Sequence, residues 1–155
     1  MPIQKLKEYL DGNKIKYVTI GHSTAYTAQE TAASAHIPGK ELAKTVVLRI
    51  DGRMVIAVLP ASHKLDIPLL KKAVGARDVE IVREADFKDL FPDCEVGAMP
   101  PFGNLYGLDV IVDELLAGNA EIAFNACSHS ELVKLAYADY IKLVKPKIAS
   151  FSVIR

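Results

Sequence analysis

Several features absent from this sequence exclude common classes of protein. The chain has 155 residues and only two cysteines, Cys94 and Cys127, which form no CxxC motif. Two distant cysteines predict neither a disulfide framework nor a thiolate metal site, so a reduced, cytoplasmic protein is expected. Lysine plus arginine equals aspartate plus glutamate at 19 each, and the net charge is zero. The chain therefore lacks the global positive field of a protein that binds nucleic acid along its backbone, although a nucleic-acid end can still be held locally.

The sequence also lacks the signatures of membrane, metal and nucleophile chemistry. No apolar run approaches the roughly 18 residues of a membrane helix, and no apolar segment of a signal peptide follows Met1. The four histidines (His22, His36, His63 and His129) show no HxxH or HExxH spacing, so neither a metal nor another cofactor is predicted. There is no GxSxG motif, and neither cysteine has an obvious base partner in the sequence. An enzyme built from this chain is therefore expected to work without a covalent intermediate.

The patterns that are present predict one domain over residues 1–155. The clearest is a β-hairpin, in which the apolar segments 46–50 and 54–59 flank Asp51-Gly52 and are expected at the centre of a sheet. Because hairpins dominate, the predicted class is α+β with a largely antiparallel sheet. Helices are predicted over residues 3–10, 27–35, 66–75 and 84–91 and from a cap at Asp139 to Val144, and strands over residues 16–21, 79–82, 108–113 and 121–126, with a terminal strand or tail at 148–154.

One segment, residues 132–136, fits either a helix or a strand, because periodicity cannot separate the two in so short an apolar run.

Three separated places hold candidate functional residues. Residues 97–103 (Gly-Ala-Met-Pro-Pro-Phe-Gly) form a stiff loop, since prolines exclude helix and central strand while glycine permits close approach to the backbone. A rigid connector and a ligand-binding loop are both compatible with this pattern. Thr27 and Glu30 fit a capping box, which leaves His22 and Tyr26 in the loop that enters a helix. Lys44 opens the first hairpin arm, either as a snorkelling charge or as a functional amine.

Together these places resemble the YbaK/prolyl-tRNA synthetase-associated editing-domain family. The resemblance rests on the segments 23–30, 43–45 and 97–103, supported by 125–130 and 137–140, and it covers essentially the whole chain. It implies a mixed, β-barrel-like sheet flanked by helices, in which residues 132–136 are a strand. One departure is Cys127, where many relatives have glycine.

The resemblance also implies a function, the hydrolysis of the ester bond of a mischarged aminoacyl-tRNA carrying alanine, cysteine or serine. The partners expected from it are the acceptor end of aminoacyl-tRNA and an aminoacyl-tRNA synthetase, and the chain would act free-standing, in trans. Family members place a functional lysine at the position of Lys44 and a substrate-binding GxxxP loop at the positions of Gly97 to Pro101.

Direct attack by water is the simplest mechanism for such an ester. The backbone N–H groups of Gly97, Ala98 and Met99 are the predicted oxyanion donors, because the prolines that follow have none. Lys44 is expected to position the terminal adenosine or polarise the ester carbonyl. The residues expected to contact substrate are His22, Tyr26, Thr27, Thr45, Pro101, Phe102, Gly103, Ser128 and His129, with core packing the stronger interpretation for Phe102.

Two other hypotheses remain compatible with the sequence: a non-catalytic module that binds a nucleotide or a tRNA end, and a small-molecule esterase.

Overall fold

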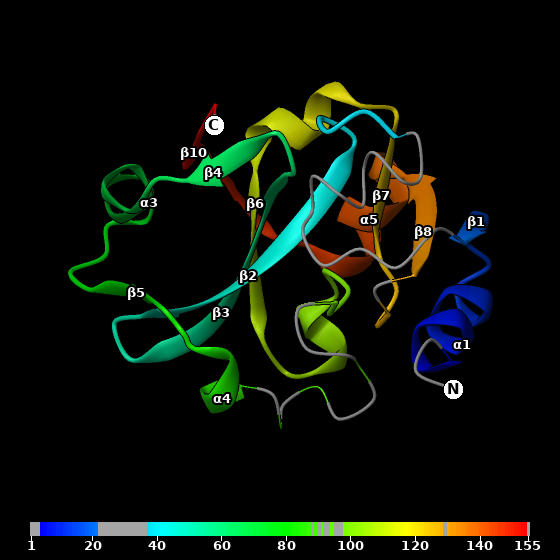
Figure 1. The fold of residues 1–155 in the computed structure, drawn as a ribbon, viewed down its shortest axis with the longest axis horizontal. Coiled ribbons are helices and arrows are strands. Elements are labelled where there is room, and N and C mark those ends of the chain that lie inside the picture. The colour runs from blue at the N-terminus through cyan, green and yellow to red at the C-terminus, as the bar shows by residue number, and fades with distance from the viewer. Residues whose placement is uncertain are drawn as a thin grey trace.

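A computed structural model describes residues 4–21, 37–87, 89, 91, 94, 98–128 and 130–154, which form a mixed α+β fold (Figure 1). Its elements in chain order are α1 (Gln4–Gly12), β1 (Tyr17–Gly21), β2 (Leu42–Ile50), β3 (Arg53–Pro60), β4 (His63–Leu65), α3 (Ile67–Val74), β5 (Val79–Ile81), α4 (Glu84–Phe87), η2 (Gly103–Leu105), β6 (Asp109–Asp113), η3 (Glu114–Gly118), β7 (Glu121–Asn125), β8 (Glu131–Ala136), α5 (Tyr137–Val144), β9 (Lys147–Ala149) and β10 (Ser152–Ile154). The helix predicted over residues 27–35 lies outside the described residues.

One large sheet organises these elements. Its strand order is β1-β8-β7-β2-β3-β6-β9, with β5 paired to β2. The hairpin strands β2 and β3 are central, as predicted. Strand β2 pairs with β7, β3 with β6 and β6 with β9 in parallel, whereas the other neighbours are antiparallel. The path ends at β1 and β9, so the described strands make an open, mixed sheet rather than a closed barrel.

The β2–β3 turn follows from two residues that tolerate a left-handed backbone. Asp51 has φ +47° and Gly52 has φ +85°, as a two-residue type I′ turn requires. The carboxylate of Asp51 also accepts hydrogen bonds from the backbone N–H groups of Arg77 and Asp78, at 3.0 and 2.8 Å. The turn is therefore specified locally and then tied to the segment that leads into β5.

Alternation along the strands creates two buried faces. On the first face, Ala43 and Val47 of β2 join Ile56 and Val58 of β3 in a core that also contains Leu6 and Leu10 of α1 and Tyr140 of α5. On the second face, Leu48 and the β3 residues Val55, Ala57 and Leu59 pack with Leu70 of α3 and with Phe151. Successive residues of a strand point to opposite faces. Neighbours on β2 therefore belong to different layers of the molecule.

Helix α3 shows local signals that the structure confirms. Asp66 caps it by accepting a hydrogen bond from Leu69 N at 2.8 Å. Gly75 ends it in a left-handed conformation, with φ +67°, as glycine does at many helix ends.

Helix α5 corrects one prediction. It begins at Tyr137 with Ala136 as its N-cap residue, so Asp139 lies in the first turn and does not cap the helix. The start is set by tertiary structure, because Tyr137 N donates to Ala120 O at 3.0 Å where β8 ends.

Two other predicted elements differ in length. Helix α4 ends at Phe87, so Phe91 lies outside it, although its ring still packs on Phe87 with centroids 6.2 Å apart. The terminal segment 148–154 is two short strands, β9 and β10. They are interrupted where Phe151 N donates to the buried carboxylate of Asp113 at 3.1 Å. The ambiguous segment 132–136 belongs to β8, as the resemblance predicted.

Candidate functional site

Two parallel strands separate at one point of the sheet. Strands β2 and β7 pair only at Leu42–Ala123 and Ala43–Phe124. Beyond these pairs the loop of residues 98–103 contacts β2 and the segment that follows β7. Thr45 Oγ1 donates to Met99 O at 3.0 Å, and Cys127 N donates to Ala98 O at 2.9 Å. We call this place the fork, and define it by Lys44, Thr45, Ala98, Met99 and residues 125–127. Strand β7 reaches its carboxyl end here, whereas β2 continues to Ile50.

The side chains of Lys44 and Thr45 lie on opposite faces of the sheet at the fork. Thr45 points to the first face, where Met99 belongs to the core. Lys44 is the preceding residue and therefore points to the second face, where its Nζ donates to His63 O at 2.5 Å. The structure thus shows Thr45 in direct hydrogen bonding with the loop, and Lys44 hydrogen-bonded to the first residue of β4.

Three residues anchor the loop in the core. Ala98 and Phe102 are fully buried and Met99 is 4% exposed. The Phe102 ring packs edge-on against Phe124 and Tyr140, with centroids 5.4 and 5.3 Å away, which confirms the expectation that Phe102 belongs to the core.

A hydrogen bond from α5 completes this anchor. The buried hydroxyl of Tyr140 donates to Pro101 O at 2.7 Å. Burial, with a smaller effect of Tyr137, raises the pKa of Tyr140 far above its ordinary value. Tyr140 therefore stays protonated and remains a donor.

The backbone C=O groups of Ala98 and Met99 are hydrogen-bonded, whereas their N–H groups bond to no described residue. Both carbonyl oxygens accept hydrogen bonds, from Cys127 and from Thr45. Among the hydrogen bonds of the described residues, none is donated by the N–H of Ala98 or of Met99. Buried backbone N–H groups are nearly always paired. These two N–H groups are therefore suited to a ligand oxygen.

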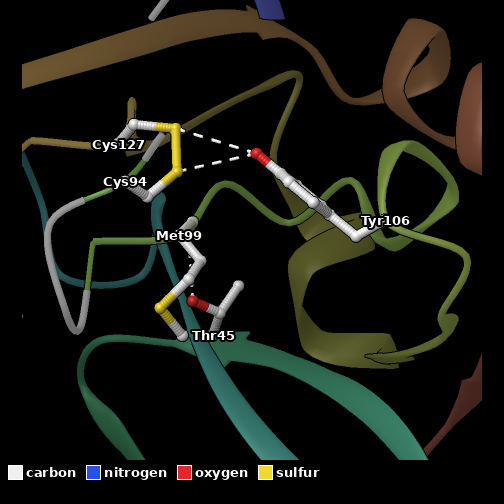
Figure 2. The surroundings of a disulfide bond; sticks show 5 residues. All are labelled: Thr45, Cys94, Met99, Tyr106 and Cys127. Carbon is white, nitrogen blue, oxygen red and sulfur yellow. Dashed lines mark hydrogen bonds between the residues drawn. A yellow bond between two sulfur atoms is a disulfide. The ribbon is translucent and has the colours of Figure 1, made fainter. Parts of the chain in front are cut away.

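The two cysteines lie together beside the loop, contrary to the expectation from the sequence. Cys94 and Cys127 form a disulfide with Cα atoms 4.1 Å apart. The hydroxyl of Tyr106 contacts both sulfur atoms, at 3.6 and 3.9 Å (Figure 2). A separation of 33 residues hides this pairing in the sequence.

Cys127 has a left-handed backbone with φ +66°. Glycine adopts this conformation without steric cost, which accounts for the glycine that the family pattern has there.

Of the other predicted contact residues, the structure describes Ser128 and leaves five outside its described ranges. Ser128 lies in the turn after β7, where its Oγ accepts from Ser130 N at 3.1 Å. His22, Tyr26, Thr27, Gly97 and His129 lie outside the described residues. Asn125, the last residue of β7, is not among the contact residues predicted from the sequence. The signal that could have identified it is an amide in an otherwise apolar strand end, Phe124-Asn125-Ala126.

A groove of about 600 Å³ lies away from the fork, at the hairpin end of the central strands. Ile50, which lines the groove, is six residue steps along β2 from Lys44, or about 20 Å. Its charges are of both signs, and Arg53 is ion-paired with Asp109. The groove therefore shows no charge preference for one ligand, and we place the candidate site at the fork.

The described ranges also bear on metal binding and membrane insertion. No three His, Cys, Asp or Glu side chains gather there as a possible metal site. No helix in these ranges is long and apolar enough to cross a membrane.

Comparison with known proteins gives matches of three kinds. The family model of the aminoacyl-tRNA editing domain matches residues 22–143. The multifunctional Ser/Thr-tRNA deacylase ProXp-y of Escherichia coli is 32% identical over 114 residues, which are 70% of this chain and 68% of the relative. A proline–tRNA ligase of Bacillus mycoides is 27% identical over 100 residues, which are 64% of this chain but only 17% of the ligase. A crystal structure described as a candidate trans-editing enzyme for prolyl-tRNA synthetase superposes with a TM-score of 0.82 at 19% identity, covering 98% of this chain and 97% of the other, and supports the fold alone.

Proposed function

The chain belongs to the aminoacyl-tRNA editing domain family, as the resemblance predicted, and we propose that it hydrolyses the ester bond of mischarged aminoacyl-tRNA. The observation that carries this proposal is the pair of adjacent N–H groups of Ala98 and Met99, which donate no hydrogen bond to any described residue and belong to a buried, anchored loop. Ester hydrolysis develops negative charge on the carbonyl oxygen, and backbone N–H groups held in place are well suited to stabilise it.

The proposed reaction needs only water and the protein's own donors. A water oxygen attacks the ester carbonyl, whose oxygen becomes an oxyanion near the N–H groups of Ala98 and Met99. Collapse of this intermediate breaks the bond between the carbonyl carbon and the ribose oxygen, which leaves with a proton as the tRNA hydroxyl. The products are a free amino acid and an uncharged tRNA. Loss of one oxyanion donor costs about 2.7–4 kcal/mol in known enzymes, so loop geometry can supply much of the catalysis.

Lys44 is proposed to position the substrate rather than to act as a base. Its bond to His63 O holds the ammonium group at the second face of the fork. A charged lysine there can bind a phosphate or ribose oxygen of the terminal adenosine, whereas a lysine base requires a strongly lowered pKa.

The remaining predicted contacts are proposed to act at the acceptor end. Four of them, which were expected to contact substrate, are proposed instead to support the loop: Thr45, Pro101, Phe102 and Gly103. Ser128 is proposed to line the entrance. His22, Tyr26, Thr27, Gly97 and His129 are proposed to complete the site.

The proposed substrates carry a small amino acid, namely alanine, cysteine or serine. Binding separates side chains that differ by one methylene by only about 1–3 kcal/mol, so editing relies on a second pocket that admits the smaller side chain. Serine and the proline tRNA are the first to test, because the relatives include a Ser/Thr-tRNA deacylase and proline–tRNA ligases. We place this activity in the cytoplasm, with a synthetase as the source of the mischarged tRNA.

Deacylation of alanyl-, cysteinyl- and seryl-tRNA, each correctly and wrongly charged, tests the proposal. We expect hydrolysis of at least one mischarged species, and a loss of about 10–100-fold in Lys44→Ala, the range for removing a charged hydrogen-bonding group. Lys72→Ala is the matched control, because Lys72 is an exposed residue of α3. Absence of hydrolysis for every species would exclude the proposed function. Equal rates for the two lysine variants would exclude only the role of Lys44.

A further inference from the structure

Asn125 carries a buried polar atom for which the fold supplies no partner. It is the last residue of β7 and lies opposite Leu132 of β8. Its Oδ1 is buried and accepts no hydrogen bond from any described residue. Nearly all buried side-chain oxygens are paired, so each exception calls for an explanation.

The register of the sheet places Asn125 beside Lys44. The parallel pairs Leu42–Ala123 and Ala43–Phe124 immediately precede them, so Lys44 and Asn125 are the first residues of the two strands beyond the last pair. Phe124 points to the first face with Ala43, so Asn125 and Lys44 both point to the second face. The unpaired oxygen therefore belongs to the fork, on the side that the lysine occupies.

The neighbouring charge selects the kind of group that this oxygen can bind. A carbonyl oxygen without a partner requires a donor N–H or O–H. The Lys44 ammonium disfavours a second cation at its side, which argues against the α-ammonium of an aminoacyl ester. A neutral hydroxyl has no such conflict. The hydroxyl next to the ester on the terminal ribose is a neutral donor, one carbon away from the reacting bond.

We propose that Asn125 is a positioning residue, whose side-chain carbonyl accepts a hydrogen bond from the free ribose hydroxyl beside the ester. The inference rests on the proposed function and adds to it a contact that the sequence did not indicate. In this arrangement the loop holds the developing oxyanion, Lys44 holds the nucleotide, and Asn125 orients the ribose that carries the ester.

A two-by-two comparison of protein and substrate tests this contact. The protein arms are the unaltered chain and Asn125→Ala. The substrate arms are mischarged tRNA ending in adenosine, and the same tRNA ending in 2′-deoxyadenosine and acylated at the 3′ oxygen. Removal of the hydroxyl is expected to slow deacylation by the unaltered protein. The same removal should slow deacylation by Asn125→Ala about tenfold less, which is the effect of one hydrogen bond in a buried site.

Stability measurements separate this role from a structural one. Asn125→Ala removes no hydrogen bond from Oδ1, so its thermal midpoint is expected not to fall. Asn119→Ala is the structural comparison: Asn119 Nδ2 donates to Lys40 O at 2.7 Å, so this variant is expected to lose stability while retaining the full sensitivity to the ribose hydroxyl. Asn125→Ser, which also removes the amide, repeats the assay if the alanine variant does not fold.

The outcomes distinguish the inference from the proposal beneath it. If the unaltered protein hydrolyses no charged tRNA, the proposed function fails and the inference fails with it. If the unaltered protein is active, but loss of the hydroxyl slows it and the Asn125 variants by the same factor, the inference alone is wrong. The latter result would assign the unpaired oxygen to another donor, such as the adenine amino group.

Discussion

Thr45 shows at the scale of one residue how a strand controls the candidate site. It is half-buried, and its hydroxyl bonds to the carbonyl of Met99, which is itself buried. That bond fixes the peptide that follows Met99, next to the N–H groups of Ala98 and Met99, which donate to no described residue. A β-branched residue suits the strand, but only one with a hydroxyl can also hold the loop.

Substitution Thr45→Val removes this hydroxyl and keeps the shape of the side chain. We expect the free energy of unfolding to fall by about 1–3 kcal/mol, because the buried carbonyl of Met99 loses its partner. Urea denaturation measures the change, and Thr45→Ser serves as the control that keeps the donor. Serine and valine variants of equal stability would show that the bond contributes little.

Helix α5 acts at the scale of elements, because it connects the sheet with the loop. Its two tyrosines differ in the hydrogen bonding of their hydroxyl groups. The Tyr140 hydroxyl donates to Pro101 O, whereas the Tyr137 hydroxyl is buried without a partner among the described residues. Burial raises the pKa of both.

The variants Tyr140→Phe and Tyr137→Phe form a matched pair. Tyr140→Phe is expected to lower the free energy of unfolding by about 1–3 kcal/mol, since it leaves the Pro101 carbonyl unpaired. Tyr137→Phe is expected to be neutral or stabilising, since it removes a buried hydroxyl that bonds to nothing in the described chain. Chemical denaturation of both variants checks the difference, and a larger loss in Tyr137→Phe would contradict it.

The turn after the loop is the second element on which the site depends. At Gly103, which begins η2, a Cβ atom would lie 2.6 Å from Leu108 O and 2.7 Å from Val110 Cγ2. The loop can reach the fork only because this position has no side chain.

Gly103→Ala is therefore expected to cost about 1–3 kcal/mol, as overpacking does in other proteins. Such a loss corresponds to a fall of about 2–4 °C in Tm per kcal/mol for a domain of this size. Gly118→Ala is the control, because no heavy atom of the described residues lies within 4 Å of its added Cβ. Equal Tm values for the two variants would show that the turn adapts.

At the scale of the whole molecule, the disulfide joins two distant parts of the chain. Cys94 precedes the loop and Cys127 follows β7, so the bond closes a segment that includes η2, β6, η3 and β7. A cross-link of this span restricts the unfolded chain.

Reduction of the disulfide is expected to lower the free energy of unfolding by about 2–4 kcal/mol. The measurement is thermal or chemical unfolding with and without dithiothreitol, together with a count of free thiols. The double variant Cys94→Ser, Cys127→Ser is the control, and its stability should not respond to the reductant. Two free thiols in the untreated protein would overturn the expectation.

Features that depend on neighbouring residues could be predicted from the sequence. The Asp51-Gly52 turn, the Asp66 and Gly75 ends of α3 and the stiffness of the 98–103 loop all follow from backbone preferences within a few positions. The family and its editing fold were also evident, because the motifs that mark it are local strings of residues.

Contacts between residues far apart in the sequence became known from the folded structure alone. It paired β2 with β7 in parallel, so that Thr45 holds the loop from one face while Lys44 and Asn125 share the other. It joined Cys94 to Cys127, and it started α5 at Tyr137 rather than at Asp139. These outcomes depend on strand partners and register, which arise from packing over long sequence separations and leave no local pattern to detect.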